Sequence, residues 1–564
     1  MRYLLFILAM LGVLAVTWRL LGSYMAAVYE GRTRWLAFAE RPVYRLLGVD
    51  PDAEQSWRRY AGALVVYSGV ALFVTYLLLR VQGHLPFNPQ HLGGVNPALA
   101  FNTAVSFVTN TNWQNYAGES TMSYLSQMGA LAVQNFASAS VGMAVAIALV
   151  RGFSRRGSAT IGNFWVDLVR GVLYILVPIA LVVTLVFIGQ GAVQTFAGPA
   201  HVRDALTGIA QTIPRGPVAS QEVIKQLGTN GGGFFNANGA HPFENPTGLT
   251  NFLSIALLLA IPVALTRTFG EMVGNVRQGV AVLAVMAVLF AGSVAIASIA
   301  EHAGNPAVTA GGLTHQVVGN MEGKETRLGV MQTTFYNVAS TQTSTGSVAG
   351  ASDSFTPVGG LVLLGGMMLG EISPGGVGSG LYTILLFAII TVFLGGLMVG
   401  RTPEYLGKKI QAREVKLAAL GVLVMPLVVL VSTGIAVSFQ AGTSSILNHG
   451  PHGFSEILYA LTSQSNNNGS AFAGLNGNTA FYNIVGALDM LLGRFAIVVP
   501  VLALAGVLAQ KQVVPASLGT FRTDSPLYAS LLLGVACIVG ALTFFPAVAL
   551  GPIVEQLLHG RFFA

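Results

Sequence analysis

The strongest constraint on the fold is a series of long apolar stretches separated by short polar ones. A helix needs about 20 mostly apolar residues to cross a membrane. Only 9% of the 564 residues are charged, against about 25% in ordinary soluble domains. The pattern predicts an all-α polytopic membrane protein with ten spans, near residues 3–24, 60–81, 126–150, 170–190, 250–268, 278–300, 358–398, 414–437, 484–508 and 527–550.

Two of these stretches have more than one interpretation. The first, 3–21, has the position of a signal peptide, but its apolar part is too long, so we expect a retained first span. The seventh, 358–398, is too long for one straight helix, and glycines and a proline interrupt it at 370–380. It is either one span broken midway by a loop or two short half-spans.

Similar polar loops recur four times along the chain. Each is a run of small hydroxyl or amide residues around one central residue, and the four central residues are Asn112, Gly231, Gly346 and Gly469. They are 119, 115 and 123 residues apart, and a nearly fixed period is typical of structural repeats. The stretch before each loop is too short to span, so we expect half-helices that enter from outside and stop midway, at 97–109, 217–227, 330–341 and 453–462.

The predicted repeat is therefore a span, a half-helix, a polar loop and a second span. Four copies around one axis form a pore of pseudo-fourfold symmetry, with one extra span at each end of the chain. The predicted divisions are 1–59 (first span and its connection), 60–150, 151–268, 269–400 and 401–510 (pore repeats one to four), and 511–564 (last span and C-terminus).

Orientation follows from the basic residues. Nineteen of the 29 lysines and arginines lie in five connections on one side of the ten spans, which the positive-inside rule assigns to the cytoplasm. Both termini, the four polar loops and all nine histidines are then outside. The net charge of +7 follows from this topology and does not indicate nucleic acid. His449 and His452 flank a Gly-Pro pair that disfavours a helical metal site, so we expect solvated loop histidines.

The loops have the composition of a cation filter. A half-helix directs its C-terminal carbonyls, the negative end of its dipole, toward the pore centre, and loop carbonyls then replace a cation's hydration shell. The loop cores contain no Asp or Glu, which divalent ions usually require, and this also argues against acid–base catalysis. We therefore expect a large monovalent cation, with potassium as the first candidate and sodium as the second.

Arg494 and Glu371 are the charged residues within apolar stretches for which we consider a functional role. Arg494 is expected to face a cavity below the filter and to form a barrier to cations, or else to pair with Asp489 or a carbonyl. Glu371 lies in the interrupted seventh stretch beside Gly376 and Gly378, where a flexible loop is either a gate across the pore exit or a packing kink.

Several segments of the sequence resemble a known family. The segments TNTNWQ (109–114), GTNGGGFFNAN (228–238), GGVGSGLY (375–382) and NNNGSAFAGLN (466–476) resemble the potassium-binding component of the bacterial Kdp potassium-transporting ATPase. The resemblance implies a multi-pass protein of the bacterial inner membrane with both termini outside. It implies potassium as substrate, no organic cofactor, and three protein partners besides membrane lipids. These partners are the ATP-hydrolysing P-type ATPase component KdpB, the component KdpC and the small peptide KdpF.

The resemblance also implies roles for individual residues. Arg494 matches the charge below the filter, and the 370–380 loop with Glu371, Gly376 and Gly378 matches the gating loop. The third loop departs from the family, because it reads Ser-Thr-Gly where the familiar form is Ser-Cys-Gly. This difference bears on the affinity for potassium. The positions that match the potassium filter are Thr111, Asn112, Gln114, Thr229, Asn230, Gly231, Thr345, Gly346, Asn468 and Gly469.

The chain carries no phosphorylation motif of P-type ATPases and no GxxxxGK[ST] loop. Its basic connections, at most about 30 residues long, are shorter than the roughly 50 residues of a small domain, so ATP coupling requires a partner. One alternative is a stand-alone potassium channel or cation symporter of the same superfamily, which would normally have eight core spans. Another is an integral membrane enzyme, which would need clustered Asp, Glu or His at one depth.

Overall fold

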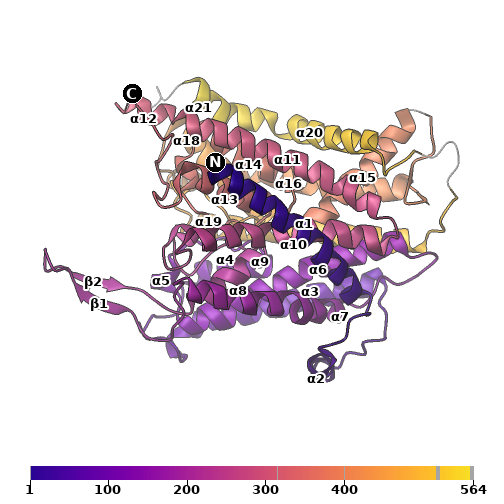
Figure 1. Cartoon of the computed structure of the whole chain (residues 1–564), viewed down its shortest axis with the longest axis horizontal. Coiled ribbons are helices and arrows are strands. Elements are labelled where there is room, and N and C mark those ends of the chain that lie inside the picture. The colour runs from indigo at the N-terminus through magenta and orange to yellow at the C-terminus, as the bar shows by residue number, and fades with distance from the viewer. Residues whose placement is uncertain (1, 314, 399, 516–520, 559–564) are drawn as a thin grey trace.

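The computed structural model describes residues 2–313, 315–398, 400–515 and 521–558, and nearly all of its regular structure is helical (Figure 1). Within these residues ten helices are long and apolar enough to cross a membrane, which confirms the predicted fold class. They are built on α1 (Arg2–Tyr29), α3 (Trp57–Val81), α6 (Val133–Ser154), α7 (Phe164–Arg170) with α8 (Val177–Gly189), α10 (Gly248–Met272), α11 (Val276–Ala303), α15 (Ser379–Met398), α16 (Ala412–Ser438), α19 (Ala480–Gln510) and α20 (Pro526–Val548).

Four shorter helices lie where the half-helices are predicted: α4 (Pro97–Val108), α9 (Val218–Leu227), α13 (Gly329–Gln342) and α18 (Gly450–Asn466). Local sequence explains where α4 begins. The Asn96 side chain accepts a hydrogen bond from the Ala98 N–H, and Pro97 occupies the first helical position, where a proline loses no helical hydrogen bond.

The fourth half-helix is longer than predicted, and one histidine prediction is wrong. Helix α18 begins at Gly450 rather than at 453, because Pro451 lies in its first turn, where proline is tolerated. His452 is therefore helical and buried, not a solvated loop residue. Its two ring nitrogens are within hydrogen-bonding distance of carboxylate oxygens of Glu555 (2.8 Å) and Asp353 (3.2 Å).

The interrupted seventh stretch consists of two helices. Helix α14 (Pro357–Met368) has 12 residues and α15 has 20, so only α15 is long enough to span alone. The break contains Gly370, Gly375 and Gly378 with positive φ values of 80°, 84° and 90°. Since such angles are readily available only to glycine, this sequence cannot continue as one helix.

Small elements complete the fold. They are α2 (Ala37–Leu47), α5 (Gly118–Thr121), α12 (Pro306–Ala310), α17 (Gln440–Thr443), α21 (Val554–Leu557) and two antiparallel pairs, β1 (Ala200–Arg203) with β2 (Ala210–Ile213) and β3 (Glu404–Tyr405) with β4 (Lys408–Lys409). The β1–β2 hairpin projects from the same end of the bundle at which α1 begins and α21 lies (Figure 1).

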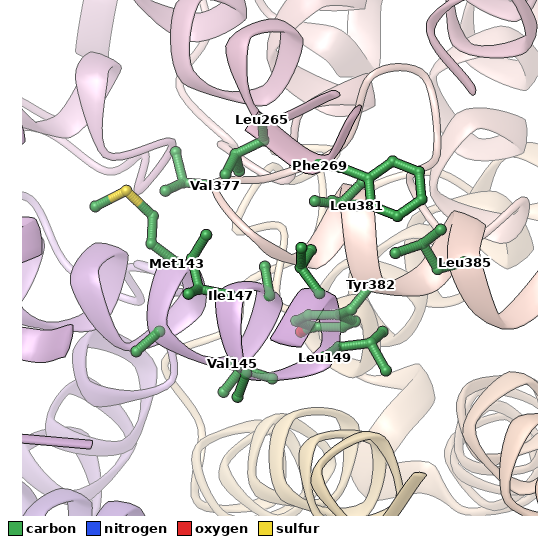
Figure 2. Packing of buried hydrophobic residues seen from close by; sticks show 14 of the residues in the cluster. Met143, Val145, Ile147, Leu149, Leu265, Phe269, Val377, Leu381, Tyr382 and Leu385 are labelled. Atoms are coloured by element: carbon green, nitrogen blue, oxygen red, sulfur yellow. The ribbon is translucent and has the colours of Figure 1, made fainter. Parts of the chain in front are cut away.

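The largest apolar core lies where spans of different repeats meet (Figure 2). Met143 and Ile147 of α6 pack there with Leu265 and Phe269 of α10 and with Leu381 of α15. Glycines allow very close approach, since a Cβ at Gly378 would overlap the carbonyl oxygen of Gly142 in α6. The break before α15 is thereby packed against the first repeat.

Candidate functional site

The four polar loops share one backbone conformation. In each loop the central residue and the residue two positions before it have left-handed φ angles, which are sterically favourable for glycine and tolerated by few other residues. The pairs are Asn110 and Asn112 (64° and 52°), Thr229 and Gly231 (45° and 79°), Ser344 and Gly346 (56° and 80°), and Asn467 and Gly469 (59° and 98°).

The same hydrogen bond closes each loop onto its half-helix. The N–H of the residue before the central one donates to a carbonyl five residues earlier, near the helix end. The bonds are Thr111 to Ser106 (2.8 Å), Asn230 to Lys225 (2.8 Å), Thr345 to Ser340 (3.0 Å) and Asn468 to Ser463 (2.8 Å). Four segments with different sequences therefore leave their helices along the same path.

The loops meet in a ring. A Cβ at Gly231 would overlap the carbonyl oxygen of Thr345, and one at Gly346 would overlap that of Asn468. A Cβ at Gly469 would likewise overlap the carbonyl oxygen of Thr111. Each central glycine thus lies against the carbonyl that precedes the central residue of the next loop, in the order two, three, four, one.

Loops one and two close the ring through side chains. The Asn110 Nδ2 donates to the Thr229 carbonyl oxygen at 3.0 Å. Gln114 holds Gly233 at both backbone groups, because its Oε1 accepts from the Gly233 N–H (3.0 Å) and its Nε2 donates to the Gly233 carbonyl (3.1 Å). Gln114 therefore fixes the spacing of these two loops.

Asn112 is the one central residue that carries a side chain. Its Nδ2 donates to Oδ1 of Asn135 in α6 at 2.6 Å, and both residues are buried. The side chain is thus held by the span behind the loop. This contact explains why the first repeat tolerates a residue other than glycine at this position.

The structure adds a buried charged group that the sequence analysis did not identify. The ammonium of Lys225, at the end of α9, pairs with the carboxylates of Glu222 and Glu244, and all three side chains are buried. Glu244 also accepts a hydrogen bond from the Phe235 N–H at 2.8 Å. The group connects the second half-helix to the chain that follows loop two. A Glu-x-x-Lys pair in so apolar a chain was the available signal.

The 370–380 loop lies against three of the four loops. Its Val377 N–H donates to the Thr229 hydroxyl (2.9 Å), and the Glu371 carboxylate accepts from Asn468 Nδ2 (2.8 Å). At Gly376 a Cβ would lie 2.8 Å from the Ser344 Cβ. Of the predicted gate residues, Glu371 and Gly376 thus contact ring loops, whereas Gly378 packs against Gly142 of α6. Loops two, three and four all contact this segment.

Arg494 forms hydrogen bonds with loop one and with α15. Its Nε donates to the Thr109 carbonyl at 2.7 Å, and its Nη1 donates to the Tyr382 hydroxyl at 3.2 Å. Of the partners considered from sequence, a carbonyl is therefore observed in place of Asp489. Arg494 and Tyr382 together line two cavities, one toward Glu371 and α16 and one toward α3 and α6. Tyr382 was not identified as a site residue, although it ends the GGVGSGLY segment.

These features define a class of membrane protein: four repeats of span, half-helix, loop and span enclose a ring of backbone carbonyls, with a broken helix and an arginine beside it. Comparison with known proteins gives the family. Residues 8–557 match the family described as Potassium-transporting ATPase A subunit. The chain belongs to this family.

Its relatives are similar over almost their whole length. The chain is 54% identical to a protein of Mesorhizobium japonicum over 99% of both chains, and 53% identical to one of Methylococcus capsulatus over 97% of both. It is 55% identical to a protein of Granulibacter bethesdensis, over 97% of this chain and 96% of the relative. Each of these relatives is named Potassium-transporting ATPase potassium-binding subunit.

Proposed function

We propose that the chain binds extracytoplasmic potassium in the ring and passes it into the membrane path of an ATP-driven uptake complex. The observation that supports this most directly is the shared conformation of four loops whose cores contain no Asp or Glu. Neutral oxygens replace the hydration shell of a weakly hydrated monovalent ion, whereas divalent ions usually need carboxylates. The ten filter positions predicted from the sequence lie in or beside this ring.

The proposed path continues below the ring. Potassium leaves the ring beside the 370–380 loop, which acts as the gate, and enters the cavity lined by Glu371, Tyr382 and Arg494. The guanidinium of Arg494 repels a cation that approaches from below, because charges interact strongly in a medium of low dielectric constant. Arg494 is thus a barrier to backward flow and not part of the binding site.

The chain does not hydrolyse ATP in this proposal. We assign hydrolysis to the P-type ATPase component KdpB, and expect KdpC and the small peptide KdpF to complete the complex. The names of the relatives, which describe a potassium-binding subunit of an ATPase, support this division of labour. The proposed location is the bacterial inner membrane, with both termini and the ring on the outer side. Potassium is the only metal ion that we assign to the filter residues of this chain.

The test is the ATPase activity of the complex, purified by co-expression with the three partner proteins and titrated with potassium, rubidium or sodium. Gly231→Asp puts a side chain and a carboxylate into the ring. We expect it to raise the half-stimulating potassium concentration about tenfold or more, since a side chain at a left-handed position costs roughly 1–2 kcal/mol even without a clash. It should also reduce the preference for potassium over sodium.

The matched control is Gly208→Asp in the exposed β1–β2 hairpin. Gly208 also has a positive φ angle, of 69°, but no neighbouring atom would contact a Cβ there. An unchanged preference for potassium in Gly231→Asp would refute the filter assignment. Failure to form a complex, with potassium flux that needs no ATP, would favour the stand-alone channel or symporter.

A further inference from the structure

Helix α2, in the connection between α1 and α3, has one face that is fixed to the protein. Its Glu40 and Tyr44 are buried. The Glu40 carboxylate accepts hydrogen bonds from Arg170 Nε of α7 (2.9 Å) and from the Tyr174 hydroxyl (3.1 Å). These bonds set the rotation of α2 about its own axis, so its other faces have defined directions.

A second face of α2 is apolar and uncovered. Phe38 and Leu46 are 75% and 87% exposed, and Trp35, just before the helix, is 57% exposed. The Trp35 indole N–H donates to the Tyr24 hydroxyl (3.1 Å) in the last turns of α1. Trp35 therefore lies at the end of a membrane span, the level at which tryptophan and tyrosine are enriched in membrane proteins.

The third face of α2 is basic. Arg41 and Arg45 are exposed and lie between the fixed face and the apolar face, and the exposed Arg34 precedes the helix. In the part of the chain that the structure describes, no carboxylate forms an ion pair with these three arginines. The single acidic residue of α2, Glu40, already pairs with Arg170.

The axis of α2 runs across the spans. In Figure 1 most spans run close to the horizontal direction and α1 runs diagonally, whereas α2 is seen nearly end-on. An axis perpendicular to the spans is parallel to the membrane plane. A helix in this plane, with aromatic and leucine side chains on one face and arginines on another, has the features of an interfacial membrane helix.

We propose that α2 lies in the interfacial layer at the basic end of the bundle, and that Arg34, Arg41 and Arg45 bind the phosphates of anionic phospholipids. Phe38 and Leu46 enter the acyl-chain boundary, where their burial is favourable. The guanidinium groups remain at headgroup level, where each is attracted to negatively charged lipids. The occupant of this surface is thus the membrane itself.

The first experiment locates Leu46 in the reconstituted complex. A nitroxide is attached to Leu46→Cys in a Cys537→Ala background, and its collision rates with oxygen and with a water-soluble nickel complex are measured. We expect high access to oxygen and low access to nickel. The matched control is Leu206→Cys in the β1–β2 hairpin, a leucine that is 97% exposed and is expected to be reached by nickel.

The second experiment tests the charge. A fluorophore at Leu46→Cys is quenched by brominated phosphatidylglycerol or brominated phosphatidylcholine, which gives the relative association of each lipid. We expect a preference for phosphatidylglycerol that falls about fivefold for each arginine removed in Arg41→Gln and Arg45→Gln. Arg413→Gln, which removes an exposed charge elsewhere at the basic end, should leave the preference unchanged.

Any of three results would overturn the proposal or a part of it. A Leu46 label as accessible to nickel as the Leu206 label would place α2 in water. A label protected from both oxygen and nickel in the complex, but reached by nickel in the isolated chain, would show that a partner protein covers the helix. Equal association of the two lipids with the unaltered helix would remove the phosphate contacts from the proposal.

Discussion

Single residues set the shape of the ring, and they do so by two different means. In loops two, three and four, the absence of a side chain brings each central glycine against the carbonyl of the next loop. In loop one, Asn112 adopts the same left-handed conformation, which asparagine tolerates better than most residues, and Asn135 holds its side chain. The ring is therefore regular in its backbone and irregular in its side chains.

Replacement of one ring glycine should reduce potassium affinity. In Gly346→Ala, the new methyl group meets the Asn468 carbonyl at a position where φ is 80°. We expect the half-stimulating potassium concentration to rise about tenfold, because left-handed alanine costs roughly 1–2 kcal/mol before the clash is counted. Gly365→Ala in α14, where a Cβ would contact nothing, is the control. Equal effects of both substitutions would argue against the ring as the binding site.

Arg494 should limit backward flow. Arg494→Gln removes the charge at the cavity but leaves a side chain that can still hydrogen-bond Thr109. We expect passive rubidium efflux from vesicles without ATP to increase about tenfold or more. A tenfold increase corresponds to the loss of about 1.4 kcal/mol of electrostatic barrier. The purified variant should unfold at the same temperature as the parent chain. Arg203→Gln, in the exposed β1–β2 hairpin, is the control, and unaltered efflux in Arg494→Gln would leave only a structural role.

Residue-level prediction succeeded where residue type and spacing were both informative. Small polar residues around a central Gly or Asn located the four loops, and the loops meet in space as the period predicts. That they filter potassium stays a prediction. Lys225 and Tyr382 were missed because their importance depends on which distant groups they meet. The Lys225 ammonium meets Glu244, and the Tyr382 hydroxyl meets Arg494 from another repeat. Such contacts follow from tertiary packing and have no local sequence pattern.

Among the elements, α18 is joined to two other parts of the chain by one ionic group at its N-terminal end. Burial alone would lower the pKa of His452, but hydrogen bonds and charge interactions with Asp353 and Glu555 outweigh it and raise the pKa from 6.5 to about 10. Asp353 follows loop three, and Glu555 belongs to α21. A protonated His452 therefore holds the C-terminal helix and the third repeat against the fourth half-helix.

This ionic group makes stability depend on pH. Since the folded pKa of His452 is above its unfolded value, the stabilisation is complete below about pH 6.5 and is lost as the pH rises through about 10. His452→Gln should destabilise the chain by about 3 kcal/mol at pH 6, since it leaves the buried carboxylate of Glu555 and the partly buried one of Asp353 without a cation. The difference should shrink steadily toward pH 10 in thermal unfolding scans. His449→Gln, at an exposed neighbour, is the control, and a difference that does not vary with pH would contradict this account.

The spans were the easiest elements to predict, and the ends of the short helices were the hardest. Composition alone identifies a stretch of 20 apolar residues, whereas the start of α18 depends on whether Pro451 interrupts a helix or begins one. The break between α14 and α15 was evident from its glycines, but not the division into a half-span and a full span. The α2 surface was missed, because an 11-residue amphipathic helix resembles any basic connection until its buried face is known.

At the scale of the whole molecule, four repeats in a single chain allow each repeat to specialise. The broken helix occurs in repeat three, the arginine in repeat four, and the buried Lys225 group in repeat two. A complex of four identical chains would place every feature four times around the axis. Here the 370–380 loop, which we propose as the gate, contacts loops two, three and four, so a single segment reaches three of the four ring loops.

The proposed orientation of the whole molecule has a direct test. The β1–β2 hairpin, the start of α1 and helix α21 lie at one end of the bundle, and positive-inside topology assigns that end to the outside (Figure 1). In a Cys537→Ala background, Leu206→Cys should react with a membrane-impermeant maleimide in spheroplasts. Arg413→Cys, exposed in the first turn of α16, should react only after the membrane is permeabilised. The opposite pattern would show that the molecule has the reverse orientation in the membrane. The ring would then face the cytoplasm, where it could not collect extracytoplasmic potassium. Labelling of both positions in sealed spheroplasts would show leakage, which a cytoplasmic marker enzyme with a reactive cysteine detects in the same sample.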